Sequence, residues 1–191
     1  MILVCIPILL AITIKPSDNF DFSGFRPEII DSVRIIEKAA HISSGIEGYY
    51  GTTPAHYYSR SRLMHMASDD ELIKLLEYPE ATVKTTAYQA LLGRESYDHY
   101  QLLKKAINDT TTFVSYQDGC VGELMMIAEY LSHYSIYCLS EEDCKMNLSG
   151  NAPYFRITSE QHRELRMLFN EKILQKEVYL LKWADEITGI K

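Results

Sequence analysis

The amino-acid sequence predicts an all-α fold, and three observations support this prediction. First, apolar residues recur at every third or fourth position in several segments, which is the spacing of helices with one buried face. Second, residues typical of helix ends flank these segments. Third, two neighbouring segments are joined by so short a turn that they must pack as an antiparallel hairpin. We therefore expect a small, irregular stack of helical hairpins, closed by a long C-terminal capping helix.

The composition is that of an ordinary globular protein with a negative charge. The chain has 191 residues, of which 47% are hydrophobic and 24% are charged, so it is long enough to bury the core of one domain. It carries 26 acidic residues against 19 Lys and Arg, which gives a formal net charge of −7. Because nucleic-acid binding usually needs a basic surface, a nucleic-acid partner is not expected.

Residues 1–15 differ from the rest of the chain. The run from Ile2 to Ile14 is almost entirely apolar, and as a helix it would be about 20 Å long, shorter than the roughly 30 Å hydrocarbon core of a bilayer. It predicts an export signal or N-terminal anchor, followed by one domain over residues 16–191. No Lys or Arg precedes the run, so a buried strand or helix of the fold is the alternative. The expected location is periplasmic or extracellular, with membrane contact only through this segment.

The first helix is expected to begin at Pro27, because proline and the following Glu28 are favoured in a first helical turn. It should end near residues 43–45. Residues 45–58 contain three glycines, one proline and four tyrosines, which predicts a loop rather than a helix. The apolar residues at helical spacing in the first helix are Ile29, Val33, Ile36 and Ala40.

Two short helices should follow this loop. Ser59 can cap a helix that runs through Met66. Ser68 and Glu71 have the spacing of a capping box, which predicts the start of the next helix. That helix should end just before Pro79, since proline disfavours a helical conformation in the residue before it.

The stretch from Asp69 to Gly93 resembles a HEAT repeat. It contains a leucine-rich helix, a turn with Pro79, and a second helix whose apolar face consists of small and medium-sized residues. The resemblance implies helix pairs that stack into an α-solenoid. Ser96 to Ile107 resembles the first helix of a second, weaker unit, although the connection over residues 108–119 is long for such a repeat. The partner helix of this unit is predicted from Val121, Leu124, Met125, Ala128 and Leu131.

The C-terminal part is expected to contain an irregular segment and then the longest helix. Residues 132–158 are mostly polar. Cys138 and Cys144 lie close enough in sequence to close a small disulfide loop in an oxidising compartment, with two unlinked thiols as the alternative. Thr158 and Gln161 are typical of a helix start, which predicts the beginning of the long helix.

Catalytic residues, metal ligands and cofactors are not predicted. The six histidines are scattered, and none belongs to the i, i+4 pair with a glutamate that marks a zinc peptidase helix. Glu129 and His133 are four residues apart, but a metal site needs three or four convergent ligands, so a surface hydrogen bond is favoured. The sequence also lacks phosphate-binding glycine loops, dinucleotide-binding fingerprints and nucleophile elbows.

Cys120 is the one thiol with an alternative role. It follows Asp118 and Gly119 just before an expected helix, and the N-terminus of a helix stabilises a thiolate. A nucleophile at this position, with His133 or His56 as its base, would make the chain a thiol-dependent hydrolase. The favoured interpretation is a small buried residue that helps to pack the helix, because free cysteines are usually buried.

The high number of tyrosines is the most informative feature of the composition. Four of the 14 tyrosines lie in the predicted loop. Recognition surfaces are rich in tyrosine because it offers a large contact area for little side-chain entropy, although packing against the first helix is an equally weighted alternative. The candidate partner-binding residues are Tyr49, Tyr50, His56, Tyr57 and Tyr58.

These observations predict an exported protein-binding module rather than an enzyme. By analogy with small solenoid binders, it would be an adaptor or an inhibitor, such as a toxin-neutralising immunity protein. The negative net charge favours a basic or neutral protein partner. The thiol-dependent hydrolase centred on Cys120 is the alternative function.

Overall fold

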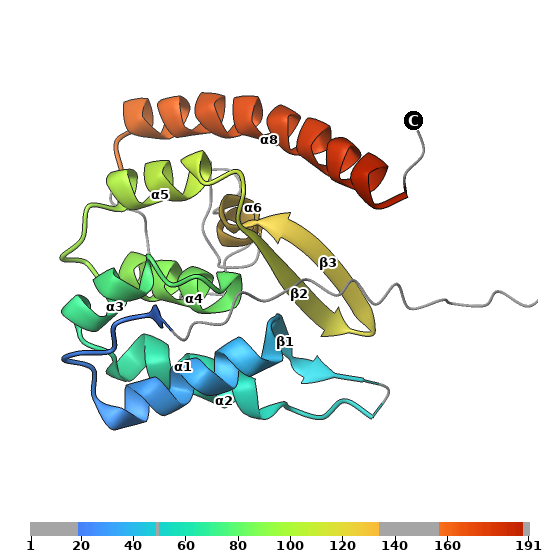
Figure 1. Cartoon of the computed structure of the whole chain (residues 1–191). Helices are drawn as coiled ribbons and strands as arrows, with labels where there is room; N and C mark the ends of the chain where they lie inside the picture. Colours follow the sequence, from blue (N-terminus) through green and yellow to red (C-terminus); the bar gives the residue numbers. More distant parts are fainter. Residues whose placement is uncertain (1–18, 49, 134–156, 189–191) are drawn as a thin grey trace, which may run out of the picture.

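The computed structural model describes residues 19–48, 50–133 and 157–188 (Figure 1). Its three strands are β1 (Ile42–Glu47), β2 (Phe113–Gly119) and β3 (Val121–Met126). Its helices are α1 (Pro27–Ala39), α2 (Ala55–Met66), α3 (Asp69–Leu75), α4 (Ala81–Leu92), α5 (His99–Asn108), α6 (Ile127–His133) and α8 (Ser159–Thr188).

The three strands form one mixed sheet, so the predicted all-α fold, a stack of helical hairpins alone, is wrong. The strand order is β1-β2-β3, with β1 parallel to β2 and β2 antiparallel to β3. Ile42 pairs with Tyr116, which lies far along the chain. Each strand is only six or seven residues long, and pairing across the sheet stabilises conformations that local sequence does not specify.

The apolar residues that follow Cys120 lie partly in a strand and partly in a helix. The segment Val121–Met126 pairs with β2 as strand β3, and α6 begins only at Ile127. The carboxylate of Glu129 accepts a hydrogen bond from the backbone N–H of Met126 at 2.7 Å, which satisfies a donor at the start of the helix. The prediction of one continuous helix over this stretch is therefore wrong for its first six residues.

α1 begins at Pro27, as predicted, but it ends earlier than predicted. Ala40 has a φ of 56°, and its N–H donates to the carbonyl of Ile36 at 3.1 Å. This left-handed residue ends the helix and turns the chain directly into β1. Ser43 and Gly45, the expected end of the helix, therefore lie in a strand.

α2 begins at Ala55, before the expected start at Ser59, and ends at Met66 as predicted. Pro54 is the N-cap residue, and its extended conformation leads into the first turn. Tyr57 and Tyr58 consequently belong to the start of a helix and not to a loop.

The capping box at the start of α3 is confirmed. The N–H of Glu71 donates to Ser68 Oγ at 3.3 Å, and the N–H of Ser68 donates to the Glu71 carboxylate at 2.7 Å. α4 packs against α3 and ends at Leu92, immediately before Gly93 as predicted. The resemblance of this helix pair to a HEAT repeat stays a prediction.

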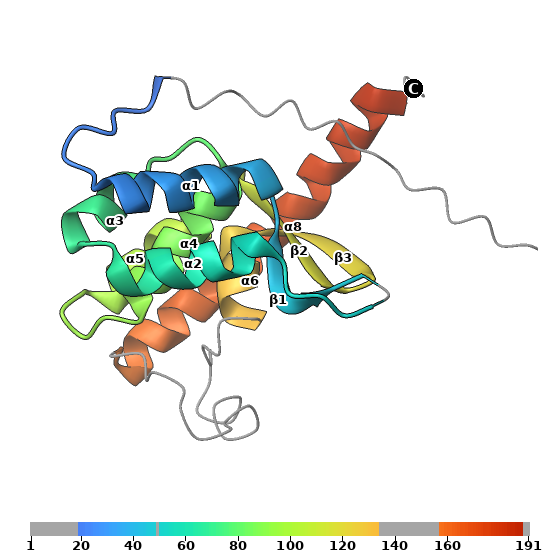
Figure 2. The ribbon, with the colours of Figure 1, turned by 90° about the horizontal axis from the view of Figure 1, so that it is seen from below.

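The core is centred on α4, which lies between α1 and α2 on one side and α5, α6 and β2 on the other (Figures 1 and 2). The face of α4 that fills this position is fully buried and consists of Val83, Ala87, Leu91 and Leu92. α8 packs on α5 at the far side of the molecule from α1 (Figure 1). The junction of β1 with α2 thus lies well away from α8.

α8 begins as predicted. The N–H of Thr158 donates to the Gln161 side chain at 2.8 Å, and the N–H of Gln161 donates to Thr158 Oγ1 at 3.2 Å. Leu165 is fully buried, and Lys176 forms an ion pair with Glu129 at 2.7 Å, which ties the helix to α6.

Two predicted features lie outside the described residues: the N-terminal segment 1–15 and the bond between Cys138 and Cys144. Within the described ranges, every helix is too short or too polar to cross a bilayer.

Candidate functional site

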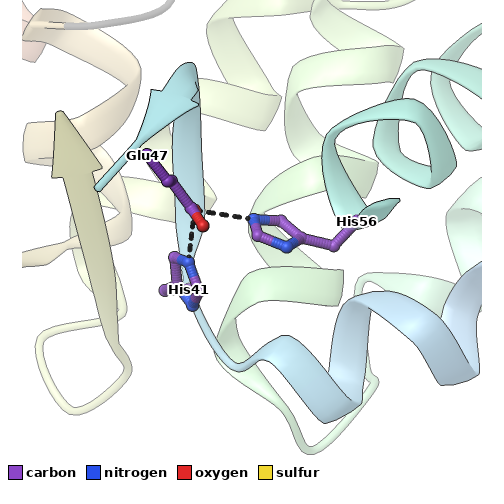
Figure 3. A group of neighbouring side chains, drawn as sticks. All are labelled: His41, Glu47 and His56. Atoms are coloured by element: carbon purple, nitrogen blue, oxygen red, sulfur yellow. Dashed lines mark hydrogen bonds and ion pairs between the residues drawn. The ribbon is translucent and has the colours of Figure 1, made fainter. Parts of the chain in front are cut away.

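The candidate functional site lies where β1 meets the beginning of α2. His41 follows the left-handed turn at Ala40, Glu47 is the last residue of β1, and His56 lies in the first turn of α2. These three side chains point toward one another (Figure 3). From the sequence, His56 is predicted as a partner-binding residue and, in the alternative hydrolase, as a possible base for Cys120, with no connection to His41 or Glu47.

The three side chains bring two imidazoles and one carboxylate together. His41 Nε2 is 2.6 Å from Glu47 Oε1, and His56 Nε2 is 3.3 Å from the same oxygen. The imidazole rings are 4.4 Å apart between centroids and meet edge to face. The ligand atoms of the three residues all lie within 4.8 Å of one another, so they could hold a metal ion.

The backbone fixes the tautomer of a neutral His41. Its Nδ1 is 2.8 Å from the carbonyl oxygen of Ala39. A carbonyl only accepts hydrogen bonds, so Nδ1 carries a proton, and Nε2 of the neutral ring presents a lone pair to Glu47. A lone pair and a carboxylate oxygen at this separation repel each other unless a proton or another cation lies between them.

His56 is the most enclosed member of the cluster. Its exposed fraction is 6%, and its Nε2 is buried without a hydrogen-bond partner, since its approach to Glu47 lacks hydrogen-bond geometry. Burial lowers the pKa of His56, and the positive charges of His41 and Arg60 lower it further, while Glu47 opposes them. His56 is therefore held as a neutral imidazole with a nitrogen directed at the carboxylate.

Backbone hydrogen bonds hold the end of β1 in place. The N–H of Glu47 donates to the Thr52 carbonyl at 2.9 Å, and the N–H of Thr52 donates back at 3.1 Å. Glu47 also pairs with Gly119 of β2. Its carboxylate thus projects from a closed turn that is anchored to the sheet.

The structure places the predicted partner-binding residues in different surroundings. Tyr49 lies outside the described residues. Tyr50 is 90% exposed in the turn after β1, and Tyr58 is 62% exposed on α2 beside Tyr57, whose ring contacts that of Tyr58 edge to face. His56, in contrast, points inward and offers almost no surface to a partner.

Tyr57 also packs over the backbone of β1. Gly45 has a φ of +103°, and a Cβ added there would lie 3.0 Å from the Tyr57 ring. We expect Gly45→Ala to lower the free energy of unfolding by about 1 to 2 kcal/mol, because it adds backbone strain and crowds the ring. Denaturant unfolding would measure the change, with Gly122→Ala as the control, since a Cβ there would lie 3.9 Å from the Tyr116 carbonyl oxygen, an ordinary contact, and the φ of Gly122 is not positive. Equal stability of the two variants would contradict the expectation.

Cys120 does not lie at a helix N-terminus. It is exposed in the turn between β2 and β3. Both sequence interpretations of this residue, a buried packing residue and a thiol before a helix, are therefore wrong about its surroundings. The expected surface hydrogen bond between Glu129 and His133 stays a prediction, because the His133 side chain lies outside the described part of the chain, and Glu129 bonds to Lys176 and the Met126 backbone.

No known protein family matches the chain, and neither curated proteins nor solved structures yield a match.

Proposed function

We propose that this chain is an exported protein-binding module and that its contact surface is the outer face of α2 together with the turn before it. The observation that carries the proposal is the chemistry of that face. Large or cationic side chains are exposed along it: Tyr57, Tyr58, Arg62, His65 and Met66. Tyrosine, arginine and methionine are the residue types enriched in the buried centres of protein interfaces.

The position of α2 supports this role. α1 and α2 lie side by side at the face of the molecule opposite α8, and α2 is near the viewer in Figure 2. The opposite face of α2 is anchored in the core by Leu63 and by the buried Arg60. A rigid helix that presents aromatic side chains loses little conformational entropy on binding, which favours affinity.

The local charge favours an acidic partner rather than the basic or neutral partner expected from the net charge. α2 contains no Asp or Glu, although the chain as a whole has a formal net charge of −7. Arg62 and His65 are exposed on it, and Arg62 forms no ion pair within the described part of the chain. Charge complementarity acts over about 10 Å at ordinary ionic strength, so the charges beside the contact decide the preference. The proposed partner is a protein segment with carboxylates next to apolar side chains.

Site-specific photo-crosslinking tests the proposal. A benzophenone amino acid would replace Tyr58 in the full chain, and the same probe at Leu174 of α8, which is 65% exposed against 62% for Tyr58, would be the matched control. In cells that produce the protein, we expect one discrete protein adduct from position 58, weakened by high salt and by Arg62→Glu, and none from position 174.

Two outcomes would contradict the proposal. If positions 58 and 174 give the same adducts, the α2 face is not a binding surface. If the adduct from position 58 survives Arg62→Glu at full yield, the partner is not recognised through its acidic groups.

A further inference from the structure

We propose that His41, Glu47 and His56 form a binding site for a divalent transition-metal ion of the zinc class. The inference is independent of the proposed protein-binding function, because the metal ligands point inward and the proposed contact residues point outward. Its basis is the convergence of two imidazole nitrogens and one carboxylate oxygen from the turn after α1, the end of β1 and the start of α2 (Figure 3).

The first argument is the direction of the two imidazole Nε2 atoms. His41 donates its Nδ1–H to the Ala39 carbonyl, which leaves Nε2 as the atom that faces Glu47 Oε1 at 2.6 Å. Histidines that ligate metals usually donate their other ring N–H to a backbone carbonyl or a carboxylate in this way. At this distance a proton or another cation bridges the two atoms, and a metal ion among the three donors can take that position.

The second argument is the buried, unpartnered nitrogen of His56. Buried polar atoms in folded proteins are nearly always hydrogen-bonded, so an orphan atom needs an explanation. His56 Nε2 has no hydrogen-bond partner, yet it is aimed at the same carboxylate oxygen as His41 Nε2. A metal ion at the point where the three donors converge would supply its missing partner.

The third argument is that the donors are held on fixed elements at nearly suitable distances. Around a tetrahedral zinc ion the ligand atoms are about 3.3 Å apart, and His56 Nε2 and Glu47 Oε1 are 3.3 Å apart. His41 Nε2, at 2.6 Å from Glu47 Oε1, would have to move away from it by about 0.7 Å to reach this spacing. The left-handed Ala40, a conformation that alanine rarely adopts, is the turn that directs His41 into the cluster.

The donor types select the class of metal. Two imidazoles with one carboxylate suit zinc and its first-row neighbours, whereas calcium and magnesium prefer oxygen ligands and copper(I) prefers thiolates. His41 and Glu47 are partly exposed, at 23% and 20%, so one coordination position can be filled by water. The buried Arg60 on the next turn of α2 repels a cation, and we therefore expect micromolar rather than picomolar affinity.

Metal titration of the full chain tests the proposal. The protein would be treated with chelator and its cysteines alkylated, so that thiolates cannot bind the metal. We expect one equivalent of Zn²⁺ to bind by calorimetry, and Co²⁺ to give the visible absorption of a tetrahedral nitrogen and oxygen site. His41→Ala, Glu47→Gln and His56→Ala should each weaken binding by at least about 100-fold. His65→Ala is the matched control, because His65 is exposed on the same helix and bonds to Ser61, and it should bind normally.

Thermal unfolding provides a second measurement that does not depend on absorption. At a zinc concentration about 100 times the dissociation constant, the wild type should gain roughly 5 to 10 °C in Tm. Glu47→Gln keeps the shape of the side chain, so it should remain folded and gain nothing. The proposal is overturned if the wild type shows neither binding nor a Tm shift, or if Glu47→Gln binds as tightly as His65→Ala.

Discussion

Replacing Arg60 by alanine is expected to lower the free energy of unfolding by about 3 kcal/mol, because the guanidinium joins three elements inside the core. Arg60 extends from α2 and is only 5% exposed. Its Nε donates to Thr86 Oγ1 at 3.1 Å, and its Nη2 donates to Gln89 Oε1 at 2.7 Å and to the Tyr130 hydroxyl at 3.1 Å. Truncation removes these bonds and leaves buried polar atoms and a void.

The geometry makes the arginine difficult to replace. Arg60 has no ion-pair partner within the described residues, so its charge is stabilised by neutral oxygens and by the ring of Tyr130, 6.0 Å from the guanidinium carbon. Lysine would keep the charge but cannot bond to α4 and α6 with one planar group. We therefore expect Arg60→Lys to lose about as much stability as Arg60→Ala.

Chemical denaturation monitored by circular dichroism measures these changes. Arg62→Ala is the control, because Arg62 is exposed on the same helix and should change the free energy of unfolding by less than about 0.5 kcal/mol. If Arg60→Ala and Arg62→Ala are equally stable, the buried network does not hold α2 to the core.

The second large effect is expected at Glu71, where Glu71→Gln should lower the free energy of unfolding by about 2 kcal/mol at neutral pH. One carboxylate closes the capping box of α3 and also binds Arg26, the residue before α1. The N–H of Arg26 donates to Oε1 at 2.9 Å, Arg26 Nη2 donates to Oε2 at 2.8 Å, and the N–H of Ser68 donates to Oε2 at 2.7 Å. The amide introduced by Glu71→Gln would accept some of these bonds but would place an NH₂ group against the donors.

The pH dependence of this effect has a definite sign. Burial alone would raise the pKa of Glu71, but the hydrogen bonds from Arg26 and Ser68 outweigh it and lower the pKa from an ordinary 4.5 to about 2. Because the folded pKa is below the unfolded one, the stabilisation is complete above about pH 5 and is lost as the pH falls toward 2. The wild type and Glu71→Gln should therefore converge in stability over that range.

Denaturant unfolding at several pH values between about 7 and 3 tests the sign. Asp70→Asn is the control, since Asp70 is an exposed acid in the same helical turn. A stability difference between wild type and Glu71→Gln that is independent of pH would contradict the assigned cause.

The helices that could be predicted are those whose ends are specified by neighbouring residues. Ser68 and Glu71 satisfy each other's backbone donors within one turn, so this helix start can be recognised from four consecutive residues. Thr158 and Gln161 act in the same way at α8. Pro27 sets the beginning of α1 through its fixed φ.

The sheet could not be predicted because its strands are stabilised by one another. Val121, Leu124 and Met125 have the spacing of one helix face, but they also fit a strand of six residues once β2 lies beside them. Four of the six residues of β3 are exposed, so burial gives no alternating pattern from which the strand could be recognised.

The metal-site candidate could not be predicted for a similar reason. His41, Glu47 and His56 have no motif spacing, and they do not share the face of one helix. They converge because Ala40 turns the chain, β1 carries Glu47 along the sheet, and the bridge to Thr52 returns the chain to α2. The one feature of the sequence that could have indicated this site is a histidine just after a glycine-rich connection, at the start of a helix.

The sequence by itself determined where α1, α3 and α8 begin, because these helix starts depend on residues within a few positions of one another. Its composition determined the overall negative charge. The tertiary structure decided the mixed sheet, the inward direction of His56 and the exposed cationic face of α2. Those features depend on contacts between segments as distant as Ile42 and Tyr116, and the free energy of such contacts belongs to pairs of segments that no local window of sequence contains.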